Sequence, residues 1–66
     1  MIHIIENDVK IDLIGQHYGE NLVEIASIQD LIQSATDQQL IDEYNYKIND
    51  LLAQNFALES LRKTLI

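Results

Sequence analysis

The sequence contains no cysteine and no proline, and it has only two glycines among its 66 residues. Without cysteine there can be no disulfide framework and no thiolate metal site, which are two usual supports of very small domains. Proline and glycine most often mark loops and helix ends, so little after Gly19 would interrupt a helix. A domain of this size buries only about 60% of the surface that its unfolded chain exposes. We therefore expect the chain to gain stability by association.

Basic residues are also scarce. Four lysines and arginines stand against 11 aspartates and glutamates, which gives a formal net charge of −7. A negative field disfavours direct binding to nucleic acid or to an anionic membrane surface. No apolar run approaches the roughly 20 residues that span a bilayer, and the first residues lack the cationic flank of a secretory signal. The sequence predicts a cytoplasmic protein with no direct nucleic-acid or membrane partner.

The predicted fold class is α+β, in a single small domain covering residues 1–66. Apolar and polar residues alternate over residues 2–14. A turn at Asn7 and Asp8 would bring the apolar side chains of this segment to one face, and both residues tolerate the backbone of a tight turn. The pattern predicts a β-hairpin over residues 2–14, which would need cover from the rest of the chain.

Residues 22–34 allow two interpretations. Asn21 is a good helix cap, and apolar residues then recur at helical spacing, at Leu22, Ile25, Ile28 and Ile32. The β-branched composition of residues 22–28 is also typical of a strand. We predict a short helix over residues 22–34 and leave a strand over 22–28 as the alternative.

A long helix is predicted over residues 37–65. Thr36 and Gln39 have the form of a capping box at its start, and Arg62 and Lys63 fall in its last turn, where the helix dipole favours cations. Such a helix would be about 43 Å long at 1.5 Å per residue. A compact monomer of this size is about 22 Å across. The helix is therefore longer than the rest of its own chain can cover.

A heptad repeat runs along this helix, with isoleucine at the first two of its four a positions, before an asparagine and an arginine, and leucine at three of its four d positions. This combination favours parallel dimers, and one buried asparagine commonly fixes the register. We predict a coiled-coil homo-oligomer, with a dimer favoured, through these self-association residues: Ile41, Tyr44, Ile48, Leu51, Asn55, Leu58 and Leu65. Further apolar residues flank the repeat at Leu40, Leu52, Leu61 and Ile66. The alternative is that the repeat is the core face of a helix folded back onto residues 22–34 and the β-hairpin.

The sequence gives no support for catalysis. His3 and His17 lie near the carboxylates of Asp12 and Glu20, but their spacing matches no known metal-ligand pattern. There is no glycine-rich phosphate loop, no cysteine nucleophile, and a chain this short can hardly enclose a pocket. We expect no catalytic, cofactor-binding or metal-binding residues, and a protein that is not an enzyme.

The predicted function is therefore binding to another protein. Tyr46 falls on the outward side of the predicted long helix, and the candidate partner-binding residues there are Asp42, Glu43, Tyr46 and Asp50. Inhibitor, adaptor and assembly-chaperone roles all fit a small acidic scaffold, and a phage or mobile element could encode such a chain to block a host factor. Two alternatives remain: a structural component of a larger assembly, and an acidic nucleic-acid mimic that fills the basic groove of a nucleic-acid-binding protein.

Overall fold

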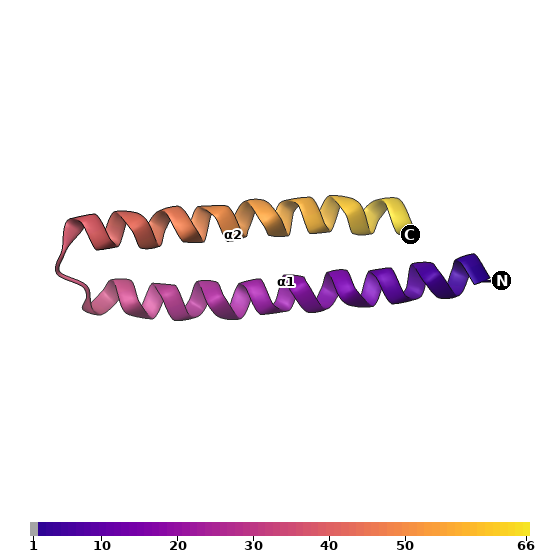
Figure 1. The fold of residues 1–66 in the computed structure, drawn as a ribbon, viewed down its shortest axis with the longest axis horizontal. Helices are drawn as coiled ribbons and strands as arrows, with labels where there is room; N and C mark the ends of the chain where they lie inside the picture. The colour runs from indigo at the N-terminus through magenta and orange to yellow at the C-terminus, as the bar shows by residue number, and fades with distance from the viewer. Residues whose placement is uncertain (1) are drawn as a thin grey trace.

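The computed structural model describes residues 2–66, with side chains from residue 7 onward, as a helical hairpin (Figure 1). Helix α1 spans Ile2–Ser34 and helix α2 spans Gln38–Leu65. The two helices run antiparallel, side by side, and residues 35–37 connect them. The molecule measures 55 × 15 × 11 Å, so it is a thin rod with its two described chain ends together at one end.

The predicted α+β fold is wrong. No strand occurs among residues 2–66, and residues 2–14, predicted as a β-hairpin, form the first turns of α1. Residues 22–34, predicted as a separate short helix, are the last part of the same helix, which also excludes the strand considered for residues 22–28. The side chains of Ile2, His3 and Ile4, on which the alternation partly depended, lie outside the described residues.

A heptad pattern in α1 explains why a helix replaces the expected strands. Buried and half-buried residues recur at alternating intervals of four and three, at Asn7, Ile11, Ile14, Tyr18, Asn21, Ile25, Ile28, Ile32 and Ala35. This stripe follows the 3.5-residue period of packed helices over most of α1, whereas the period-two pattern ends at Leu13. The longer pattern prevails because it gives α1 a continuous face to pack against α2.

The core of the hairpin lies between the last third of α1 and the first half of α2. Ile25, Ile28 and Leu51 are buried there, and Ile32, Tyr44 and Ile48 pack against them. Each fully buried Leu or Ile side chain stabilises a fold by roughly 1.5–3 kcal/mol relative to its exposed state. A core of this size gives the hairpin modest stability as a single chain.

The predicted long helix is present as Gln38–Leu65, but its cap differs from the prediction. Asp37 is the N-cap rather than Thr36, because an Asp37 carboxylate oxygen accepts a hydrogen bond from the backbone N–H of Gln39 at 3.0 Å. The backbone carbonyl of Asp37 accepts the first helical bond, from the N–H of Ile41 at 3.0 Å. One acidic side chain thus ends the connection and starts α2.

Both glycines lie inside α1 with ordinary helical backbone, since neither has a positive φ. A Cβ placed on Gly15 or Gly19 would meet no atom within 4 Å, so close packing does not require glycine at either position. Each glycine costs a helix interior roughly 0.5–1 kcal/mol relative to alanine. Helix α1 therefore tolerates two weak points because its stripe packs against α2.

Candidate functional site

The predicted self-association residues of α2 all face α1 of the same chain. Leu51 and Asn55 are buried, with 2% and 5% of their surfaces exposed. The others are half-buried: Ile41, Tyr44, Ile48, Leu58 and Leu65. We call the contact between these residues and the α1 stripe the seam. A second copy could use the seam only by displacing α1, and self-association through it stays a prediction.

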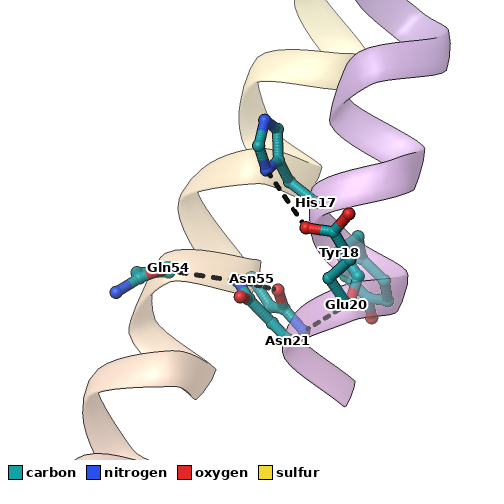
Figure 2. A network of polar contacts seen from close by, with 6 residues as sticks. All are labelled: His17, Tyr18, Glu20, Asn21, Gln54 and Asn55. Atoms are coloured by element: carbon teal, nitrogen blue, oxygen red, sulfur yellow. Dashed lines mark hydrogen bonds and ion pairs between the residues drawn. The ribbon is translucent and has the colours of Figure 1, made fainter. Parts of the chain in front are cut away.

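Two asparagines form the polar centre of the seam (Figure 2). The side-chain amide of Asn21 donates a hydrogen bond to the Asn55 side-chain oxygen at 2.9 Å. The Asn55 amide donates to the backbone carbonyl of Tyr18 at 3.4 Å. The Asn21 amide also lies 3.4 Å from the Gln54 side-chain oxygen. No buried side-chain nitrogen or oxygen within the described part of the chain lacks a hydrogen-bond partner.

This pair fixes the register of the two helices. Sliding α2 by one heptad along α1 would place Asn55 against Ile14 or Ile28 instead of Asn21. A buried amide left without a partner costs about 1–3 kcal/mol. The sequence indicated a buried asparagine at position 55, but it gave Asn21 only the role of a helix cap.

The predicted partner-binding residues all lie exposed on the outward side of α2. Tyr46 is 78% exposed, and Asp42 and Asp50 lie one helical turn before and after it. Each aspartate accepts a hydrogen bond of 3.0 Å from a glutamine side chain, Asp42 from Gln38 and Asp50 from Gln54. Together with Glu43, three residues before Tyr46, these residues make an acidic surface around one aromatic ring. We call it the Tyr46 face.

A second candidate site lies where the helices approach their free ends. One hollow of about 340 Å³ is lined by His17, Asn21, Gln54, Ala57, Leu58 and Leu61. Another of about 380 Å³ is lined by Lys10, Leu13, Ile14, Leu61 and Leu65. Leu61 lines both, so the two hollows form one continuous surface depression, which we call the open-end groove. Leu13 and Leu61 are each half exposed, at 50%.

Sequence reasoning found only one side of this groove. Leu61 was noted as an apolar residue that flanks the heptad repeat of the long helix. Leu13 was assigned to a strand, so no inference could bring it beside α2. Extending the four-and-three spacing of Ile25, Ile28 and Ile32 backward to Ile11 would have predicted a helix over this segment and so placed Leu13 beside α2.

Among residues 7–66, an arginine–glutamate ion pair and a histidine–glutamate contact lie at the helix surface. The Arg62 guanidinium donates a hydrogen bond to the Glu59 carboxylate at 3.1 Å. This hydrogen bond is the main reason that the pKa of Glu59 is lowered; desolvation opposes it, and the positive charges of Arg62 and Lys63 lower the pKa further. His17 and Glu20 approach to 3.8 Å, with about two thirds of each side chain exposed.

The described residues hold no group of three or more histidine, cysteine, aspartate or glutamate side chains that could bind a metal ion. Of the two histidines considered for a metal site, His17 lies beside Glu20, and the side chain of His3 lies outside the described residues. Neither described helix is long and apolar enough to cross a membrane. No protein-family model, curated protein or solved structure matches the chain.

Proposed function

We propose that this chain is a non-catalytic protein-binding module and that it binds a basic protein surface through the Tyr46 face. Inhibitor, adaptor and assembly-chaperone roles are all compatible with this mode of action. The proposal keeps the cytoplasm as the compartment that the sequence predicts.

The exposure of Tyr46 is the observation that carries the proposal. A tyrosine that is 78% exposed on a continuous helix contributes almost nothing to the packing of its own chain. Tyrosine is enriched among the residues that dominate binding energies at protein interfaces. Its helical position also limits the conformational freedom that binding would have to remove.

Charge supports a basic partner. Asp42, Glu43 and Asp50 lie within about one helical turn of Tyr46, with the single base Lys47 among them, and the whole chain carries a formal charge of −7. Such a field attracts a positive surface over about a Debye length and raises the rate of encounter. The hydrogen bonds from Gln38 and Gln54 hold Asp42 and Asp50 on the helix surface while leaving acceptor capacity free.

The nucleic-acid mimic is the weaker candidate. A DNA duplex carries one charge per roughly 1.7 Å, which amounts to about 32 charges along a rod of this length. The hairpin is 55 Å long and has 11 acidic residues in total. Its acidic residues therefore supply only about a third of the charge of the polymer it would imitate.

A structural role in a larger helical assembly is the second candidate. It is favoured by exposed apolar residues on other sides of the hairpin, since Phe56 is 77% exposed and Val23 is 68% exposed. In that role the partner would be another helical chain, bound with fixed stoichiometry through several faces of the rod.

Capture of partners from a lysate of the source cell, followed by mass spectrometry, tests the proposal. The test variant neutralises the Tyr46 face with Asp42→Asn, Glu43→Gln, Asp50→Asn and Tyr46→Ala. The control removes the same number of charges from α1 with Asp12→Asn, Glu20→Gln and Asp30→Asn. We expect a basic protein that the wild-type chain and the control retain and that the test variant loses.

Retention by both variants would contradict the Tyr46 face as the binding site. Absence of any captured protein beyond those that bind an unrelated acidic helical bait would contradict the function itself.

A further inference from the structure

The open-end groove exposes leucines that the hairpin itself cannot cover. Leu61 lies at its centre and Leu13 at its edge, each with half of its surface exposed. The seam beneath the groove is shallow, because Ile14 is the one buried hydrophobic residue described in this half of the rod. Leu13 and Leu61 lie beside the seam, whereas Leu58 and Leu65 lie within it and are half-buried.

The accessible surface of the chain is larger than that of a compact monomer of the same mass. Its accessible area is 5149 Å². A compact monomer of the same mass exposes about 4300 Å², so the excess is about 850 Å². A standard protein interface buries about 800 Å² on each partner. The excess therefore matches one interface.

The charge pattern indicates where that interface lies. The chain has 11 acidic residues, and none of the described residues that line the groove is acidic, although Glu20 and Asp50 contact two lining residues, His17 and Gln54, at its rim. The titratable groups on its lining are Lys10 and His17. Two copies of a strongly acidic chain meet with least repulsion where each lacks carboxylates.

We propose that two copies of this chain pack groove against groove and form a four-helix bundle. The two-fold arrangement places the same surface of each copy in the interface, so each copy covers the Leu13 and Leu61 side chains of the other. The inference rests on the proposed function in one respect, that this chain acts by association rather than by catalysis. The Tyr46 face borders this interface at Gln54, which lines the groove and donates a hydrogen bond to Asp50, but Tyr46 itself does not line the groove.

The test measures the mass of the full chain by light scattering or sedimentation over a range of concentrations. A dimer doubles the 7.6 kDa mass of one chain. Because each copy carries a charge of −7, added salt should screen the repulsion and strengthen the dimer.

Two matched variants locate the interface. Leu61→Glu puts a carboxylate at the centre of the groove and should weaken the dimer at least about tenfold. Leu52→Glu is the control, since Leu52 is also 50% exposed on α2 but flanks the seam on the opposite side. It should leave the dimer intact. Leu13→Glu, on the other helix, should repeat the effect of Leu61→Glu, and circular dichroism confirms that each variant remains helical.

A wild-type chain that stays monomeric from ~1 μM to ~1 mM overturns the proposal, because its dimer would then have a dissociation constant above ~1 mM, too weak for a stable dimer. A dimer broken by Leu52→Glu and kept by Leu61→Glu also overturns it, as does a mass above that of two chains. These outcomes are separate from the proposed function. A monomer that still captures a basic partner removes only the dimer, and a dimer that captures nothing removes only the binding role.

Discussion

The two halves of the hairpin differ in how deeply they bury the residues of the seam. Near the connection, the seam is a continuous cluster in which Ile25, Ile28 and Leu51 are buried. Toward the free ends, the seam contains the Asn21–Asn55 pair, Ile14 is the one described hydrophobic residue that is buried, and Leu58 and Leu65 are half-buried. The half near the connection therefore holds the main apolar cluster, and the seam of the free-end half is shallower and more polar. Both halves also expose leucines beside the seam, such as Leu31 and Leu61.

This difference shows that the half near the connection supplies most of the hydrophobic core, while association of two copies through the free-end half is our proposal. The half near the connection has the short sequence separations that make contacts easy to form, because residues 35–37 join its helices. The free-end half must bring together residues up to about fifty positions apart. The polar residues of its seam set the register. Its Leu13 and Leu61 side chains stay half exposed in the single chain.

The largest expected effect comes from the core near the connection. Leu51→Ala removes the most buried side chain described, with 2% exposed, and should lower the free energy of unfolding by about 3 kcal/mol. Ile14→Ala, in the free-end half, should cost less, about 2 kcal/mol, because Ile14 lies outside the main cluster. Urea unfolding followed by circular dichroism at one chain concentration measures both. Equal losses would contradict the division between the halves.

Substitutions of the asparagine pair should change the free energy of unfolding less, and the double variant should recover stability that the single variants lose. Asn55→Leu leaves Asn21 without its 2.9 Å partner, so it should cost about 1 kcal/mol despite the added apolar surface. The double variant Asn21→Leu with Asn55→Leu removes both amides together and should be more stable than either single variant. A double-mutant cycle of unfolding free energies measures the coupling. Additive effects would show that the two side chains do not act as a pair.

The smallest effect concerns Glu59 in the free-end half. Its pKa is lowered chiefly by the hydrogen bond from Arg62, so the folded chain favours the charged carboxylate. The resulting stabilisation is present above the ordinary glutamate pKa, about 4.3, and is lost as the pH falls through the lowered folded value. Thermal unfolding of wild type and Glu59→Gln should therefore show a small difference at neutral pH that disappears in acid. A difference that persists at all pH values would contradict this cause.

The sequence predicted α2 better than α1, for a physical reason. Thr36 and Asp37 mark the start of α2, and its heptad repeat runs without interruption from Ile41 to Leu65. In α1, residues 2–14 satisfy a period of two, and Gly15 and Gly19 weaken the local preference for a helix. Only packing against α2 selects the helix, and that packing is not visible in either segment alone.

The candidate sites follow the same rule. Tyr46 could be placed on the outward side of α2 because its position depends on that helix alone. The open-end groove requires Leu13 on one helix and Leu61 on the other, so it could not be predicted while residues 2–14 were taken as a hairpin of strands. Likewise Asn55 was identified as a buried polar residue, but its partner Asn21 became visible only when the register was known.

The connection between the helices has one further consequence. If α1 continued straight through residues 35–37, its stripe would pass from Ile32 to Gln39, whereas the α2 seam begins at Ile41. Two residues correspond to a rotation of about 200° around a helix axis. In a single straight helix the two apolar stripes would therefore point in nearly opposite directions, and no one neighbour could cover both. The offset between the two heptad stripes therefore favours a chain that reverses direction, as does the helix cap at Asp37.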